Sequence, residues 1–172
     1  EGKLKGKGTM STIIPVEVWD TALEGVALTV ETIEKVINKI KKSKWYLDLK
    51  RKDPKTRAEV DKELENLKKY TQQIKDTPDD TYAYLNRALA NDNLGNYEDA
   101  IADYSKVIEL NPESAWRYKA RARLYDNLGK HKEAIADYSM AIKLNPDDAD
   151  AYYNRGYSYA NLEKYKDAIA DY

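Results

Sequence analysis

The sequence has no cysteine, a single histidine and only seven glycines. Without cysteine, a disulfide, a thiol nucleophile, a zinc ribbon and an iron–sulfur cluster are all excluded, which fits a reducing compartment. The glycines form no phosphate-cradling loop, and one histidine is a poor basis for a nucleophilic triad. We therefore expect that the protein is not an enzyme and that it has no catalytic residue, no metal and no cofactor.

Long hydrophobic runs are also missing, since no stretch approaches the roughly 18 consecutive apolar residues of a membrane-spanning helix. The N-terminus lacks the succession of basic, apolar and small residues that marks a secretory signal. These absences predict a cytoplasmic protein. Residues 1–9, EGKLKGKGT, stand before Met10 and are interpreted as a tag or linker, so they are left out of the fold prediction.

The sequence does contain a repeat with a period of 34 residues. The segments NLGNYEDAIADY, NLGKHKEAIADY and NLEKYKDAIADY start at Asn93, Asn127 and Asn161. Other sets keep the same step, namely Arg87, Arg121 and Arg155; Ala88, Ala122 and Gly156; and Pro78, Pro112 and Pro146. A fixed period of this length is typical of a solenoid of stacked supersecondary units.

Each repeat is predicted to be two helices joined by a short turn. Apolar residues at three- and four-residue spacing indicate a first helix, helix A, over 81–94, 115–128 and 149–162. A second, helix B, begins near residues 97, 131 and 165. In the first two repeats it closes at an Asn-Pro pair, 111–112 and 145–146, because proline cannot continue the helical hydrogen bonds. Helix B carries a stripe that one hairpin alone cannot bury, made of Ile101, Ile135, Ile169, Tyr104, Tyr138 and Tyr172.

Residues 78–172 therefore resemble the tetratricopeptide repeat, with repeats at 78–111, 112–145 and 146–172, the last one truncated. The resemblance rests on the small residue in helix A, the glycine between the helices, the alanine and aromatic residue in helix B, and the proline at the boundary. Tyrosine in place of phenylalanine, Glu163 in place of the inter-helix glycine and Asn91 in place of an aromatic residue depart from it. It implies an all-α fold, an α-solenoid of helix-turn-helix repeats.

The chain ends at Tyr172, in the middle of the third helix B. A solenoid normally needs a polar capping helix at each end. We therefore expect either a fragment of a longer protein whose repeats continue, or self-association through the open C-terminal end.

Residues 10–77 are predicted to form a long helical hairpin. Apolar periodicity indicates one helix over 16–42 and a second over 54–75, with 43–53 as the linker. We favour a cap on the first repeat over a separate interaction or effector-type domain. A membrane-active first helix is the least favoured, because its several carboxylates suit anionic lipid poorly.

Nine basic residues lie between Lys39 and Arg57, with Trp45 and Tyr46 among them. Such a segment could bind nucleic acid or an acidic peptide. A solvated linker is the preferred interpretation, since cations at the end of a helix are favoured by its dipole in any case. Nucleic acid and membrane partners are therefore not favoured.

The family resemblance implies that the exposed sides of the A helices line a concave face and bind a protein or peptide partner. The candidate partner-binding residues are Tyr82, Asn86, Leu89, Trp116, Lys119, Arg123, Asn127, Tyr153, Asn154 and Tyr157. Asparagine amides can pair with a peptide backbone, and Lys119 with Arg123 can accept a carboxylate. Some family members clamp the C-terminal tails of chaperones, but only Lys119 and Asn154 fall in the matching positions, so a tail clamp is not favoured.

Other repeated polar residues have structural interpretations. Arg87, Arg121 and Arg155 are predicted to pair with Asp103, Asp137 and Asp171 as a ladder between helices A and B. Helix capping is the role expected of Asn93, Asn127, Asn161, Asp147, Asp148 and Asp150. His131 takes the repeat position of Tyr97 and Tyr165, and is interpreted as a packing substitute.

Two hypotheses of function follow. The first is a scaffold that captures a partner protein or peptide on the concave face, and it should keep binding without residues 1–75. The second is a sensor or oligomerisation arm of a larger signalling or effector protein, with residues 16–75 as the active helical element. A change at Trp19 or Leu23 should abolish that activity. Nucleic-acid binding through residues 39–57 is a third, and predicts affinity that falls steeply with salt.

Overall fold

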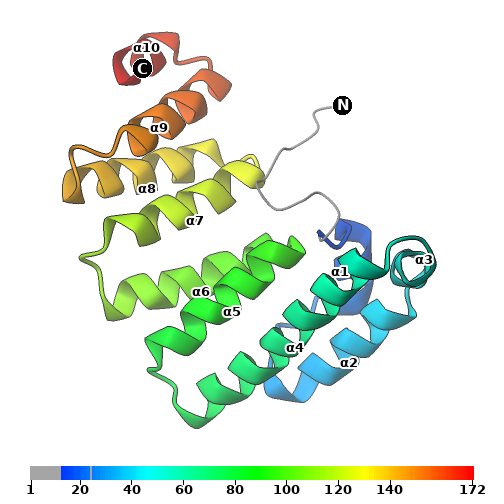
Figure 1. Cartoon of the computed structure of the whole chain (residues 1–172). Helices are drawn as coiled ribbons and strands as arrows, with labels where there is room; N and C mark the ends of the chain where they lie inside the picture. The colour runs from blue at the N-terminus through cyan, green and yellow to red at the C-terminus, as the bar shows by residue number, and fades with distance from the viewer. Residues whose placement is uncertain (1–12, 24) are drawn as a thin grey trace. The chain divides into compact units, whose positions relative to one another are not determined.

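The computed structural model describes residues 13–23 and 25–172, and every regular element in that part of the chain is a helix (Figure 1). In chain order the helices are α1 (Val16–Leu23), α2 (Val30–Lys42), α3 (Lys44–Lys52), α4 (Pro54–Asp76), α5 (Thr81–Leu94), α6 (Tyr97–Leu110), α7 (Ala115–Asn127), α8 (His131–Leu144), α9 (Ala149–Asn161) and α10 (Tyr165–Asp171). Two compact units are present. The first ends at Asp103 and the second, from Tyr104 to Tyr172, begins inside α6.

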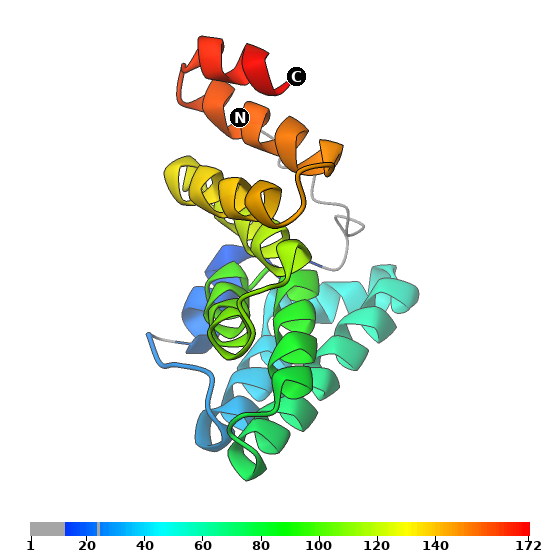
Figure 2. The ribbon, with the colours of Figure 1, turned by 90° about the vertical axis from the view of Figure 1, so that its left-hand side faces the viewer.

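The helices of the repeats lie where the sequence predicts them. Helix A corresponds to α5, α7 and α9, and helix B to α6, α8 and α10. In the second unit α7 packs on α8, α8 on α9 and α9 on α10 (Figure 2). The turn after α5 and that after α7 use glycine at positive φ, 81° at Gly95 and 70° at Gly129, whereas Glu163 takes φ 60° after α9. The all-α fold class is confirmed.

The predicted ladder of ion pairs is present in all three repeats. The guanidinium of Arg87 donates to both carboxylate oxygens of Asp103, at 2.9 and 2.7 Å. Arg121 and Asp137 pair at 2.7 and 2.8 Å, and Arg155 and Asp171 at 2.7 and 2.6 Å. Each aspartate side chain is almost fully buried, so the bidentate geometry compensates the cost of desolvating it. The pairs hold each helix A to its own helix B.

The prediction of one helix over 16–42 is wrong, because the chain forms α1 and α2 instead. Gly25 takes φ 73°, a left-handed conformation that ends the helical path. Thr29 then begins α2 with a capping box, in which its backbone N–H donates to the Thr32 hydroxyl at 2.9 Å. Apolar spacing was continuous across this break, so periodicity alone did not reveal it.

The predicted linker 43–53 is also wrong, because most of it is α3. The Ser43 hydroxyl accepts from the Tyr46 N–H at 3.2 Å and starts this helix, while the Tyr46 hydroxyl donates to Asp61 on α4 at 2.6 Å. Asp53 and Pro54 then start α4, with the Asp53 carboxylate accepting from the Thr56 N–H at 3.1 Å. The segment that the sequence predicted to be a solvated linker is therefore mostly α3, which packs on α4.

The hairpin itself exists, formed by α2 and α4 with α3 in the connection. Its two helices are antiparallel, because ion pairs join Lys41 to Glu65, Glu34 to Lys68, and Glu31 to Lys75. Val60, Leu64 and Leu67 of α4 and the buried isoleucines of α2 belong to one core, which also takes in Leu94 at the end of α5.

The segment before α2 packs on α5 within the first unit. The Ile14 N–H and the Trp19 indole N–H both donate to the Leu94 carbonyl, at 2.8 and 3.1 Å. This satisfies a carbonyl that the end of a helix otherwise leaves without an intrahelical partner. A side chain at Gly95 would also meet Ile13, since an ideal Cβ there lies 2.5 Å from the Ile13 Cγ2 atom. The end of α5 is thus closed by the N-terminal segment.

Candidate interaction surface

The candidate surface consists of the outward sides of the A helices, hereafter the A-helix face. It carries the ten residues that the sequence analysis selected, and it is described separately on α5, in the first unit, and on α7 and α9, in the second. Residues in corresponding positions stand 34 apart, as do Tyr82 and Trp116. Helical geometry places side chains four residues apart on one side, so each helix presents a short row.

The row on α5 contains two exposed apolar side chains and one amide, which is hydrogen-bonded to its own helix. Tyr82 is 61% exposed and Leu89 is also exposed. The Tyr82 ring meets the buried Tyr70 of α4 edge to face, with centroids 6.2 Å apart and planes at 77°. Burial and the neighbouring Tyr82 hydroxyl raise the pKa of Tyr70. The Asn86 amide donates to the Tyr82 carbonyl at 2.7 Å, which fixes its orientation.

On α7 the largest exposed side chain is Trp116. It is 45% exposed and stands edge-on against Tyr104, with centroids 6.3 Å apart and planes at 85°. A partly exposed tryptophan held against a buried ring offers a large apolar contact with little conformational freedom left to lose. Trp116 is thus a rigid anchor on the second unit.

Lys119 is held by the following repeat. Its ammonium donates to Asp148 at 2.7 Å and lies 4.0 Å from Asp150. Asp148 is the N-cap of α9 and accepts from the Ala151 N–H at 3.1 Å, so its predicted capping role is confirmed. The hydrogen bond from Lys119 lowers the pKa of Asp148. Lys119 therefore has a carboxylate partner within the protein, a competitor for any ligand carboxylate.

A shallow cavity of about 290 Å³ brings four of the selected residues together on the second unit. It is lined by Trp116, Lys119, Ala120, Arg123, Tyr138, Asp150 and Asn154. Asn154 donates to the Asp150 carbonyl at 2.7 Å, just as Asn86 binds its own helix. The lining combines two aromatic side chains, an amide, two cations and a carboxylate, which is a surface that suits a mixed polar and apolar peptide.

The other selected residues of this unit lie outside that cavity. Tyr153 and Tyr157 are exposed on α9, and the Tyr153 ring packs against Tyr172 with centroids 5.6 Å apart. Asn127 is half-buried, and its amide nitrogen has no hydrogen-bond partner among the described residues. The amide of Asn161, which aligns with Asn127, instead donates to the Tyr157 carbonyl at 2.9 Å.

A buried polar cluster around Asp126 was missed by the sequence analysis. The Asp126 carboxylate accepts from the Ser158 hydroxyl at 2.8 Å, and the His131 imidazole lies 2.9 Å from it. Burial raises the pKa of Asp126, and burial together with the charge of Asp126 raises the pKa of Tyr138. Serine and histidine both face the aspartate instead of one another, so the cluster links α7, α8 and α9 without the geometry of a nucleophilic triad.

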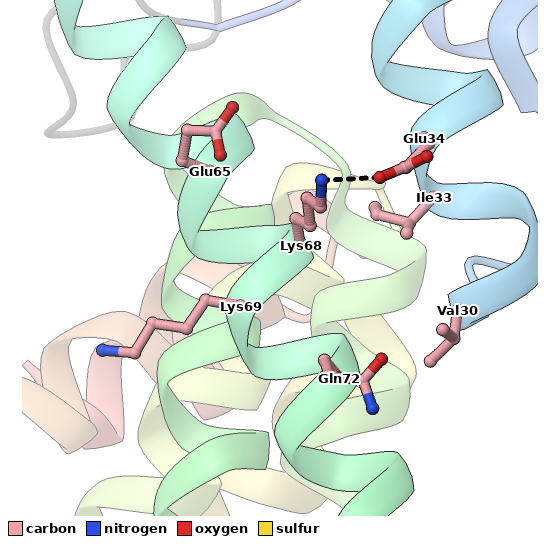
Figure 3. Close-up of a pocket in the computed structure, with 7 residues that line it drawn as sticks. All are labelled: Val30, Ile33, Glu34, Glu65, Lys68, Lys69 and Gln72. Atoms are coloured by element: carbon pink, nitrogen blue, oxygen red, sulfur yellow. Dashed lines mark ion pairs between the residues drawn. The ribbon is translucent and has the colours of Figure 1, made fainter.

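A larger cavity of about 550 Å³ lies on the first unit between α2 and α4 (Figure 3). Its lining is Val30, Ile33, Glu34, Glu65, Lys68, Lys69 and Gln72. The Lys68 ammonium on α4 pairs with Glu34 on α2 at 2.5 Å (Figure 3). Both side chains are at least half exposed, so this pair adds little to stability.

Two cations of the basic segment, Lys41 and Arg57, are paired within the protein. Lys41 pairs with Asp61 at 3.5 Å, and Arg57 donates to the Tyr46 hydroxyl at 3.1 Å. The side chains of residues 50–52 lie outside the described residues. Over the described part of the chain, no three His, Asp or Glu side chains gather in a way that could hold a metal ion. None of its helices is both long and apolar enough to cross a membrane.

Comparison with known families identifies the repeats. A model described as tetratricopeptide repeat matches residues 81–114, and one described as TPR repeat matches residues 122–163. The chain contains tetratricopeptide repeats. This agrees with the predicted family and with the α-solenoid fold class. No curated protein matched the chain.

Solved structures with tetratricopeptide repeats resemble the chain. The second TPR of Spaghetti (RPAP3), solved bound to the HSP90 peptide SRMEEVD, is 28% identical with a TM-score of 0.51, over 53% of this chain and 84% of that one. A crystal structure of MamA protein is 21% identical with a TM-score of 0.61, over 94% and 87% of the two chains. MamA 41-end from Desulfovibrio magneticus RS-1 is 13% identical with a TM-score of 0.61, over 98% and 93%. The MamA likeness extends the shared fold upstream of the tetratricopeptide repeats.

Proposed function

We propose that the protein is a non-catalytic interaction scaffold, which binds a partner protein or peptide through the A-helix face. The observation that carries this proposal is the rigid, half-exposed Trp116 beside a cavity that also exposes Arg123 and the Asn154 amide. Tryptophan and arginine are the side chains most often found at the energetic centre of protein interfaces. The absence of cysteine fits a cytoplasmic setting for this role.

The HSP90 peptide SRMEEVD bound by the similar RPAP3 repeat gives a first ligand class, an acidic peptide. Two features argue for a different ligand here. Lys119 already pairs with Asp148, and the large hydrophobic side chains exposed on α5 and α9 are those of Tyr82, Leu89, Tyr153 and Tyr157. A partner that inserts apolar side chains beside Trp116 therefore fits the surface better than an acidic peptide. The peptide SRMEEVD is a direct probe of this point, and we expect it to bind weakly.

The proposal is tested by affinity capture from the source lysate with Trp116→Ala and Arg123→Glu variants. Each should reduce the recovery of a specific partner by roughly tenfold or more, because a hot-spot side chain contributes about 2 kcal/mol. Circular dichroism should show unchanged helix content. Lys119 is left intact, because changing it would also disturb the N-cap of α9.

Lys132→Glu is the matched control, since Lys132 is an exposed cation on α8 outside the cavity. It should retain the partner at the parental level. Equal capture by the parent and both cavity variants would show that the A-helix face of the second unit does not bind the partner.

A second partner surface is favoured by the exposed side of α10. Tyr165, Ile169 and Tyr172 are all exposed there, whereas Tyr138, which aligns with Tyr172, is 2% exposed. We propose that this side of α10 supports self-association of the chain.

A further inference from the structure

Helix α4 repeats part of the helix-B pattern one period upstream of the first recognised repeat, with Asn66 and Lys69 in place of the recurring alanine and aspartate. Leu67, Tyr70, Thr71 and Ile74 stand 34 residues before Ile101, Tyr104, Ser105 and Ile108. Tyr70 is buried like Tyr104 and Tyr138, and Thr71 is buried as well. The two family matches begin only at residue 81, so they leave this helix unassigned.

The hydrogen bonds of α4 to α5 reproduce those of later repeats. Arg121 donates to the Ser105 hydroxyl at 2.8 Å, and Arg155 to the Ser139 hydroxyl at 3.0 Å. Arg87 points in the same way to the Thr71 hydroxyl, with a longer distance of 3.4 Å. In each case the hydroxyl lies sixteen residues before the arginine. The arginine of each helix A therefore reaches back to the preceding helix B, and α4 takes that place for α5.

The aromatic contacts agree with this assignment. Tyr70 on α4 meets Tyr82 on α5 at 6.2 Å and 77°, and Tyr104 meets Trp116 at 6.3 Å and 85°. The members of each pair are twelve residues apart, and the two pairs are related by the 34-residue step. The two aromatic contacts are of the same type and stand in the same register. The likeness of α4 to a helix B is therefore more than accidental.

Helix α2 stands where the missing helix A belongs. It is antiparallel to α4 and has 13 residues, as α7 and α9 do. Its buried Ile33, Ile37 and Ile40 share a core with Leu64 and Leu67 of α4. The difference lies in the connection, which contains α3 instead of a short turn. The insertion removes the helix-A signature from its expected register.

We infer that α2 and α4 form an additional, degenerate repeat with α3 inserted, so that the array begins at Val30. Tyr70 then acts as a positioning residue, which holds Tyr82, the first exposed aromatic side chain of the A-helix face. This second statement rests on the proposed function, whereas the repeat itself does not.

Hydrogen exchange measured by mass spectrometry on the whole chain tests the inference. In Tyr70→Ala, exchange should become at least about tenfold faster in α4 and α5 together, because a repeat and its neighbour share one interface. Tyr138→Ala provides the calibration, since it should accelerate α8 and α9 together. Lys62→Ala, an exposed change on α4, should leave both helices of the first unit unchanged.

Acceleration confined to α4 in Tyr70→Ala, with α5 as in the parent, would overturn the inference. If that variant unfolds the first unit outright, Thr71→Val decides instead. It keeps the volume but removes the acceptor for Arg87, so α5 should exchange faster, and an unchanged α5 would count against the repeat. Partner capture with Tyr70→Leu then separates the two statements. Retained binding together with coupled exchange would leave the repeat standing and remove only the positioning role of Tyr70.

Discussion

At Asp148 a single carboxylate serves two elements at once. It caps the first turn of α9 and accepts a hydrogen bond from Lys119 on α7, so it joins two successive repeats. Sequence position alone indicated the cap, because aspartate one residue before a helix is a standard N-cap. It did not indicate the lysine, whose partner lies 29 residues away in the chain. The consequence is that Lys119, selected as a ligand-binding cation, stabilises the array.

This arrangement predicts a pH-dependent effect of Asp148→Asn. Asparagine keeps the capping acceptor but removes the charge, so the free energy of unfolding should fall by roughly 0.5–1 kcal/mol near pH 7. The folded-state pKa of Asp148 is lowered, so its contribution is complete above the unfolded pKa of about 4 and is lost as pH falls through the folded value. Urea unfolding near pH 7 and near pH 2.5 measures the difference. Asp147→Asn, at an exposed neighbour, should have little effect at either pH, and an equal loss for Asp148→Asn at both would contradict the account.

The Asp126 cluster shows a different limit of prediction from the sequence repeat. Ser158 aligns with Ala90 and Leu124, and His131 with tyrosines, so the cluster occurs at one junction only. Its bonds cross from α7 to α9 over 32 residues. An alignment of the repeats reveals the residues that recur. It did not reveal this cluster, because these residues differ from their counterparts in the other repeats. His131 was interpreted as a packing substitute, and its half-buried ring pairs with Asp126 in addition.

At the scale of the element, the turn after each helix A contains one residue in the left-handed conformation, but the three residues differ in identity or in surroundings. Gly95 meets the Ile13 side chain, Gly129 has open space around its Cα hydrogen, and Glu163 accepts the conformation with a side chain. Left-handed backbone disfavours any residue with a Cβ. The three turns therefore separate the conformational cost of a side chain from the steric cost.

Gly95→Ala and Gly129→Ala are expected to differ in the free energy of unfolding. Gly129→Ala should cost about 1 kcal/mol for the backbone conformation alone. Gly95→Ala should cost about 3 kcal/mol, because its Cβ would also collide with Ile13 in a packed contact. Urea denaturation of both variants measures this. Equal costs would show that residues 13–23 do not hold the end of α5 closed in solution. Glu163→Gly should be neutral or stabilising, by up to about 1 kcal/mol.

At the scale of the whole molecule, the exposed side of α10 predicts that the chain self-associates. Sedimentation velocity should show a reversible, concentration-dependent oligomer. Ile169 is 75% exposed and Tyr172 is 65% exposed, whereas Tyr104 and Tyr138, which align with Tyr172, are buried. Ile169→Glu should shift the equilibrium to monomer. Lys166→Glu, an exposed change on the same helix, should not. A parent chain that stays monomeric at the highest soluble concentration would contradict the proposal.

The sequence by itself determined the 34-residue period, the helices of the recognised repeats and the arginine–aspartate ladder. These features are local or recur in every repeat, so periodicity, turn chemistry and alignment suffice to find them. Only the tertiary structure decided that the predicted helix 16–42 is broken, that α3 packs on α4, that Lys119 pairs with Asp148 and that the Tyr70 ring contacts Tyr82. Each of these depends on residues distant in the chain or on an insertion that shifts the register. The free energy of such contacts comes from packing and pairing, which a single-sequence pattern does not contain.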